Sequence, residues 1–379
     1  MKKLIAIFAV VLFAAPAFAA DWSFYGSQRI ATWYVDRDYG DGVVNGQDDD
    51  QATQWYFQGN SRLGAKVKAD KVSGQIEFAL GPSSTSNGDG GDTNVSTRLA
   101  FGVWNFSDNA WLRVGKSTST LTDSISNQFF DADKNMYGVG EFYGRRPAGV
   151  TLGIGDFELA FLPTSYGTET GTSTGGINGA TGGDADSYFP RLEASYKLKF
   201  NAGHIKPFAG GQYYTVESNG IGNITGDLDV WSWVVGVSTS WNIGAFSIGG
   251  QLSYGMNQGN VTGWSTGSND RTSSSAYLST SGRNIKDVYT LQALLVPALK
   301  FSDTLRFEAG FGFRQDNADD APGYSQKDEV WVTYLQAMIT LAPGVFLCPE
   351  VGYYDYMDGV NGRDQGNQWY AGAKWQIDF

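Results

Sequence analysis

The sequence has few of the residues on which most catalytic and metal sites depend. Its 379 residues include one cysteine, Cys348, and one histidine, His204. A single cysteine excludes an internal disulfide and clustered thiolate ligands, and a single histidine excludes paired-histidine metal sites. There are 27 Lys and Arg against 39 Asp and Glu, a formal net charge of -12, with no basic tract for neutralising nucleic-acid phosphates. We therefore expect a non-enzymatic protein with no cofactor, no metal site and no nucleic-acid partner.

Long apolar runs are also missing beyond the N-terminus. No segment after residue 19 has the 18 consecutive apolar residues typical of a membrane-spanning helix. Residues 1–19 are typical of a cleaved secretory signal peptide: Lys2 and Lys3 precede a short apolar stretch, and Ala17-Phe18-Ala19 forms a cleavage site. Loss of Lys2 and Lys3 changes the formal charge from -12 to -14. We expect residues 20–379 to form one exported domain.

Glycine and aromatic residues are abundant, and apolar residues recur with a period of two. The chain has 50 Gly, 12 Trp, 20 Tyr and 23 Phe. Between residues 304 and 316, Leu305, Phe307 and Phe311 alternate with polar residues such as Arg306 and Glu308. This alternation places one set of side chains on each face of a strand. The pattern predicts about sixteen strands, one of them over residues 142–153.

The predicted connections alternate between short turns and long polar loops. The short ones include Asp70-Lys71, Ser107-Asp108 and Ser302-Asp303, and the long ones include residues 165–187 and 259–285. This layout is typical of bacterial transmembrane β-barrels. Only a closed sheet satisfies every backbone group in hydrocarbon, and a water-filled lumen tolerates the charged face. The sequence therefore predicts an all-β, transmembrane antiparallel barrel with short periplasmic turns and long extracellular loops.

Three segments resemble one known family. Residues 60–70 (NSRLGAKVKAD) are similar to the second strand of Gram-negative general diffusion porins, and residues 111–116 (WLRVGK) resemble the strand before their third loop. The alternating C-terminus that ends in Phe379 resembles their outer-membrane assembly signal, with Ile377 where an aromatic residue is usual. The family's Pro-Glu-Phe-Gly-Gly-Asp loop motif is absent.

The resemblance implies a homotrimer in the bacterial outer membrane, in contact with lipid and lipopolysaccharide. It further implies that the β-barrel assembly machinery reads Trp375, Ile377 and Phe379. The third loop, residues 119–141, is expected to fold into the lumen and face a basic wall across the constriction. The expected wall residues are Arg29, Arg62, Lys66, Arg98, Arg113, Arg145 and Arg146, and the expected loop acids are Asp123, Asp131, Asp133 and Glu141.

These features favour a channel for passive diffusion of ions and small hydrophilic solutes. Opposed charged walls orient polar solutes and tune ion preference, and the acidic loops, including Asp48-Asp49-Asp50, favour a weak preference for cations. Two alternatives remain: a substrate-specific channel with an internal binding site, and a closed barrel that acts as an adhesin or structural anchor. Trp22, Trp33, Trp55 and Trp369 lie near predicted strand ends, where they favour interfacial girdles over an internal sugar-binding track.

Overall fold

The structure, a computed structural model, describes residues 20–40, 50–82, 93–166, 173–262, 274–318, 327–358 and 362–379. The expected signal peptide at residues 1–19 and the acidic loop tip at 41–49 lie outside the described residues.

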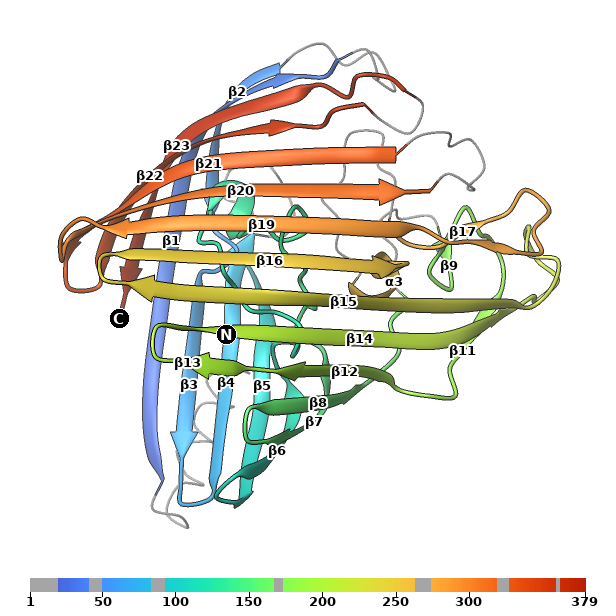
Figure 1. Cartoon of the computed structure of the whole chain (residues 1–379), viewed down its shortest axis with the longest axis horizontal. Helices are drawn as coiled ribbons and strands as arrows, with labels where there is room; N and C mark the ends of the chain where they lie inside the picture. Colours follow the sequence, from blue (N-terminus) through green and yellow to red (C-terminus); the bar gives the residue numbers. More distant parts are fainter. Residues whose placement is uncertain are drawn as a thin grey trace.

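The described chain forms one closed antiparallel barrel of sixteen strand crossings (Figure 1). β1 (Asp21–Asp38) pairs with β2 (Asp50–Phe57) and with β3 (Arg62–Lys68), and β2 and β3 together make one crossing. β23 (Asn367–Asp378) closes the barrel by pairing with β1. Another crossing consists of β11 (Asp184–Asp186), β12 (Arg191–Tyr196) and β13 (Leu198–Phe200). The remaining crossings are β4 (Val72–Pro82), β5 (Thr93–Ser107), β6 (Ala110–Lys116), β7 (Ala148–Ile154), β8 (Phe157–Leu162), β14 (Gly203–Glu217), β15 (Leu228–Ile243), β16 (Phe246–Met256), β19 (Tyr289–Lys300), β20 (Leu305–Asn317), β21 (Lys327–Ala342) and β22 (Val345–Asp355). The prediction of an antiparallel barrel with about sixteen strands is confirmed.

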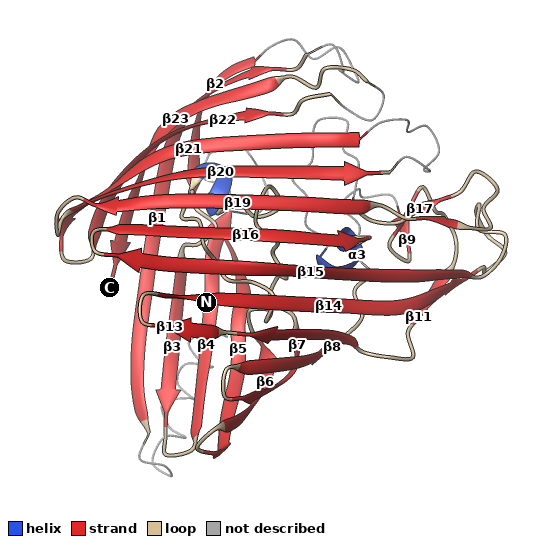
Figure 2. Cartoon of the chain, in the orientation of Figure 1, coloured by secondary structure: helices blue, strands red, loops and turns tan. Residues whose placement is uncertain are grey.

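Four short strands form a second sheet, separate from the barrel wall. They are β9 (Ser173–Thr174), β10 (Ile177–Asn178), β17 (Tyr277–Leu278) and β18 (Ile285–Lys286). Two short helical segments, α2 (Phe130–Asp133) and α3 (Gln258–Thr262), complete the described elements (Figure 2). In the part of the chain that the structure describes, no helix has the length and apolar character to cross a membrane.

Alternation along the strands separates an apolar outer face from a charged inner face. In β20, Phe307 and Phe311 are exposed on the outside, whereas Glu308 and Arg314 are buried inside. Short turns such as 343–344 gather at one end of the barrel and long connections at the other (Figure 1). The pattern follows from lipid contact: side chains that face hydrocarbon must be apolar, while polar ones are tolerated inside.

Two sequence-based expectations differ from the structure. Trp33 does not belong to an outer girdle but is fully buried inside the barrel, unlike Trp22, Trp55 and Trp369, which are exposed. The strand expected over residues 142–153 begins only at Ala148. Phe142 and Tyr143 belong to a loop whose apolar side chains are buried in the lumen, and such residues imitate the pattern of a strand.

The outer face gives a first prediction. Leu252 lies midway along β16 with its side chain exposed on that face. Replacing Leu252 with Arg is expected to lower the free energy of unfolding in bilayers by about 2–4 kcal/mol, because the charge then faces hydrocarbon. Denaturant titration of the protein in phospholipid vesicles, followed by tryptophan fluorescence, measures this change.

Ser96→Arg serves as the control. Ser96 pairs with Ala79, which pairs with Arg62, so all three lie on the inner face of the barrel. Because Ser96 is exposed there, the same charge should change stability by no more than about 0.5 kcal/mol. Equal losses for both variants would contradict the assignment of the two faces.

Candidate channel constriction

A long connection between β6 and β7 folds into the barrel. We call residues 117–147 the inner loop; it contains the segment expected from sequence, 119–141, and extends beyond it. Its middle carries α2, where Asp131, Ala132 and Asp133 have φ angles of 48°, 66° and 60°. Residues with a Cβ adopt this left-handed region at a cost, and it persists only where surrounding contacts enforce it.

An apolar core holds the inner loop against one side of the lumen. Phe129 and Phe130 are buried against Trp33 of β1 and Tyr370 of β23. The rings of Phe130 and Tyr370 stack with centroids 3.7 Å apart and planes 9° apart. Burial of several aromatic rings stabilises the loop in one position and removes this part of the lumen from water.

Wall carboxylates accept hydrogen bonds from the inner-loop backbone. Glu350 of β22 accepts from the amides of Phe129 and Phe130 at 3.0 and 3.2 Å. Glu308 of β20 accepts from the backbone and side-chain amides of Asn127 at 2.9 and 2.8 Å. Other amides of the loop donate to carbonyls within it, as that of Asp133 does to Phe129. The wall carboxylates satisfy the backbone donors of Asn127, Phe129 and Phe130.

Asp123 fixes the first part of the loop to a different wall. Its carboxylate lies 2.7 Å from Nε2 of His204 and accepts a hydrogen bond of 2.9 Å from Ser238. The ammonium nitrogens of Lys197 and Lys206 lie 3.7 and 3.9 Å away. Burial acts to raise the pKa of Asp123, but the hydrogen bond from His204 and the charge of Lys206 outweigh it, so the pKa is lowered. Asp123 is thus ionised at neutral pH and paired.

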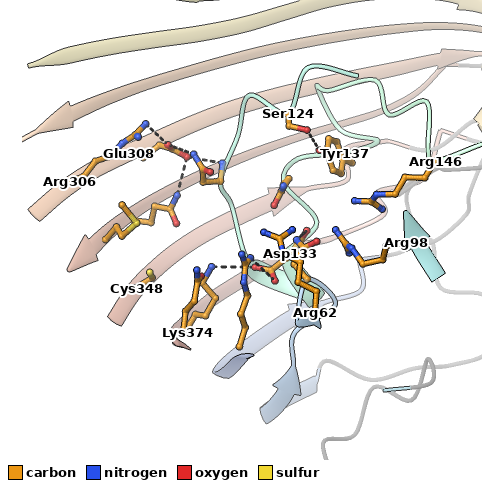
Figure 3. Close-up of a pocket in the computed structure, with 17 residues that line it drawn as sticks. Arg62, Arg98, Ser124, Asp133, Tyr137, Arg146, Arg306, Glu308, Cys348 and Lys374 are labelled. Atoms are coloured by element: carbon orange, nitrogen blue, oxygen red, sulfur yellow. Dashed lines mark hydrogen bonds and ion pairs between the residues drawn. The ribbon is translucent and has the colours of Figure 1, made fainter. Parts of the chain in front are cut away.

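A cavity of about 370 Å³ remains beside the inner loop (Figure 3). Asp133 lies in its wall, 3.4 Å from Arg29 and 3.4 Å from Lys374. Arg98 and Arg62 also line the cavity, and they lie 2.8 and 3.7 Å from Glu77. The charged lining residues are Arg29, Arg62, Arg98, Arg146, Arg306 and Lys374 against Asp133 and Glu308. Basic groups therefore outnumber acidic ones in this lining.

Comparison with solved structures places this architecture among known folds. The outer-membrane channel DcaP of Acinetobacter baumannii matches with a TM-score of 0.70 at 18% identity, over 95% of this chain and 97% of that one. The anion-selective porin of Comamonas acidovorans matches with 0.58 at 14% identity, over 95% and 100%. OmpT, an outer-membrane protein of Vibrio cholerae in its trimer form, matches with 0.52 at 15% identity, over 94% and 99%. The fold is that of the outer-membrane porins. No family model and no curated protein sequence matches the chain.

Four of the seven expected basic residues line the cavity: Arg29, Arg62, Arg98 and Arg146. The other three lie elsewhere. Arg113 pairs with Glu158 at 3.3 Å and stacks on the ring of Trp111. Lys66 lies over the ring of Tyr25, and Arg145 is exposed on the loop.

The four expected acids are similarly divided. Only Asp133 lines the cavity. Asp123 anchors the loop as described, and Asp131 pairs with Lys134 at the loop surface. Glu141 is fully buried within the loop, where it accepts hydrogen bonds from the amides of Ile125 and Ser126. Glu141 therefore supports the loop conformation and does not face the opposing wall.

Arg306, Glu308 and Lys374 line the cavity but were absent from the expected set. The alternating pattern already placed them on the polar face of their strands. The pattern does not predict how far along the barrel axis each residue lies, and this position decides which lumen residues contact the inner loop. A strand register, read from the pairing of β20 with β21 and of β22 with β23, would have supplied it.

Glu141 gives the loop a pH dependence. Burial, which removes the carboxyl group from water, raises the pKa of Glu141 from 4.5 to about 8. Between these values an unfolded loop loses the proton while the folded loop keeps it. The folded loop therefore becomes less stable as the pH rises from 4.5 to about 8.

Glu141→Gln is expected to remove this dependence, because the amide cannot ionise but still accepts a hydrogen bond. Hydrogen–deuterium exchange of peptides within 119–141, corrected for the intrinsic rate, should rise from about pH 5 to about pH 8 in the unaltered protein and stay level in the variant. Asp131→Asn, at a partly exposed ion pair, should keep the unaltered profile. An unchanged pH profile in Glu141→Gln would show that another group is responsible.

Proposed function

We propose that the chain is an outer-membrane porin: a non-enzymatic, water-filled channel for passive diffusion of ions and small hydrophilic solutes. The observation that carries the proposal is the cavity beside the inner loop, which is lined by charged side chains inside a closed barrel. A closed barrel with an apolar exterior suits a bilayer, and a charged lumen suits hydrated solutes. The porin fold of the compared structures supports the same function.

The lining favours anions at the constriction. Arg29 and Lys374 share Asp133, and Arg62 and Arg98 share Glu77. Each of these two carboxylates thus has two cations around it. This preference is opposite to the cation preference expected from the net charge of the chain, and the compared Comamonas channel carries the description anion-selective.

Arg146 adds a further positive charge. It donates a hydrogen bond of 2.6 Å to the hydroxyl of Tyr143, and within the described residues no carboxylate lies within ion-pair distance of it. Burial and the neighbouring charge of Arg98 both lower the pKa of Arg146, although Tyr143 opposes them. An arginine nevertheless stays charged at physiological pH, so the side chain attracts anions that enter the cavity.

Conductance in planar bilayers tests the proposal directly. The purified protein should give stepwise currents that rise in proportion to salt concentration, with a reversal potential of anion-preferring sign in a salt gradient. Saturable block by one solute class would favour the substrate-specific alternative, since a binding site fills and a general pore does not. Absence of any current would favour the closed barrel.

Neutral replacements of the arginines should move the ion preference towards cations. Arg98→Gln and Arg146→Gln each remove one positive charge from the cavity wall, so each is expected to shift the reversal potential towards that of a cation-selective pore. Arg283→Gln is the matched control, because Arg283 is exposed in an outer loop and undergoes the same charge change. Shifts of equal size in all three variants would mean that the cavity does not control selectivity.

We further propose a homotrimer whose contact surface is an apolar groove on the outer face of β1, β3 and β4. The groove has a volume of about 370 Å³, and its walls include Phe24, Leu63, Ile76, Phe78 and Phe379. Its occupant is a second copy of the chain, as the trimer form of the compared Vibrio protein supports. Lipid and lipopolysaccharide cover the rest of the outer face. Trp375, Ile377 and Phe379 point outward on β23 and at its end, where the assembly machinery can read them.

Truncation within the groove should weaken the trimer. Leu63→Ala combined with Ile76→Ala removes apolar contact from the proposed interface and is expected to lower the temperature at which the detergent-solubilised trimer dissociates. Leu252→Ala with Ile248→Ala makes the same chemical change at comparably exposed sites on β16. Gel filtration after graded heating compares the two pairs, and equal dissociation temperatures would place the interface elsewhere.

A further inference from the structure

A second loop also enters the lumen. α3 follows β16, and its Val261 is buried against Leu121 and Phe142 of the inner loop and against Phe208 and Val234 of the wall. Through this contact, the connection between β16 and β19 and the inner loop pack together as one body. The connection between β16 and β19 therefore joins the inner loop in the interior of the barrel.

Side-chain hydrogen bonds fix this second loop in place. The amide nitrogen of Asn260 donates to the hydroxyl of Tyr214 at 3.1 Å, and its carbonyl accepts from the backbone of Ala276 at 2.9 Å. Asn257 donates to the backbone carbonyl of Trp231 at 2.9 Å and accepts from the amide of Val288 at 2.9 Å. Each asparagine thus connects the segment to a neighbouring strand or loop.

The small sheet β9–β10–β17–β18 extends this body towards the outer mouth (Figure 1). Ile177 and Ala180 of one loop and Ala276 and Leu278 of another are buried together. They pack on inward-facing residues of β14 and β15, namely Tyr214, Val216, Leu228 and Val230. We call residues 257–261 together with this sheet the outer plate.

The outer plate leaves the two sides of the lumen differently exposed. On β15, Ser232 faces inward and is buried, as is its partner on β14, Gln212, which donates to the backbone carbonyl of Asn260 in the plate at 2.9 Å. On the opposite wall, Ser96 of β5 is exposed, and the side chain of Arg62 is 32% exposed. Solvent therefore reaches these lumen residues of β3 and β5, whereas these lumen residues of β14 and β15 are buried.

We propose that the outer plate is a second inward-folded obstruction, which seals the β14–β15 side and holds the inner loop from outside. Solutes then pass only along the β3–β6 wall, and the inner loop and the outer plate, in series, set the size limit. The inference rests on the proposed diffusion function and adds the route and a second determinant of size. It makes Asn257, Asn260 and Val261 positioning residues for the constriction.

Two matched cysteine variants test the route. In a Cys348→Ser background, Ser96→Cys and Ser232→Cys make the same change on opposite walls, and a charged, membrane-impermeant methanethiosulfonate is the probe. Ser96→Cys should react rapidly and lose conductance. Ser232→Cys should react about 100-fold more slowly, because the plate must open locally before the reagent enters.

Two glycine variants test the plate itself. Gly182 and Gly179 both have a φ of +74°, so alanine is equally strained at either position. A Cβ on Gly182 would lie 1.3 Å from the carbonyl oxygen of Ile221, whereas one on Gly179 would meet nothing within 4 Å. Gly182→Ala should therefore displace the segment that follows β10 from the β14–β15 connection and so loosen the plate to which β10 belongs. It should speed the labelling of the introduced thiol in the Ser232→Cys protein and admit larger polyethylene glycols than Gly179→Ala does.

The outcomes separate this inference from the proposed function. Equal labelling rates for the two cysteine variants, or equal polymer limits for the two glycine variants, would overturn the outer plate while a conducting channel remained. Protection of Ser232→Cys in a protein that passes no current would leave the plate in place and overturn the diffusion function.

Discussion

The absence of water from the hydrocarbon of a membrane is the constraint on which this structure depends. Every backbone amide in that region needs a partner within the protein, so the sheet must close, and β1 does so by pairing with β23 along twelve residues from Ser27 to Asp38. Closure with sixteen crossings leaves an interior too wide for wall side chains to fill. The inner loop and the outer plate are consequences of that excess width.

Filling a wide lumen with loops creates a second hydrogen-bonding problem, and buried carboxylates solve it. The irregular backbone inside the barrel pairs with itself only in part, and Glu308 and Glu350 of the wall accept hydrogen bonds from other loop amides. A buried carboxylate is stabilised by a neighbouring positive charge, and Arg306 lies 3.1 Å from Glu308. The charged residues of the lumen therefore serve two purposes, since some support the loops and others face the solute.

Sequence alone was sufficient for the barrel and insufficient for the constriction. Period-two alternation predicts faces because it depends only on neighbouring residues, as Phe307 and Glu308 show. Alternation does not predict the faces where the inner loop is involved. Phe142 alternates like a strand residue but is buried in the lumen, and Trp33 resembles a girdle residue but packs on Phe129. Which charges meet across the lumen depends on register and on the path of the inner loop, and neither is encoded locally. For this reason Lys374, which lines the cavity, was missing from the expected set.

The net charge of the chain and the charge of the cavity lining differ in sign, and a physical reason keeps the two apart. Salt at physiological concentration screens exposed charges over about 8–10 Å, so acidic residues in outer loops have little influence on an ion deep inside the barrel. An ion beside Arg62, Arg98 and Arg146 responds to those side chains, because they lie well within the screening distance. The loops that narrow the lumen leave the solute route next to the wall that carries these arginines. A chain with a formal charge of -12 can in this way present a positive constriction.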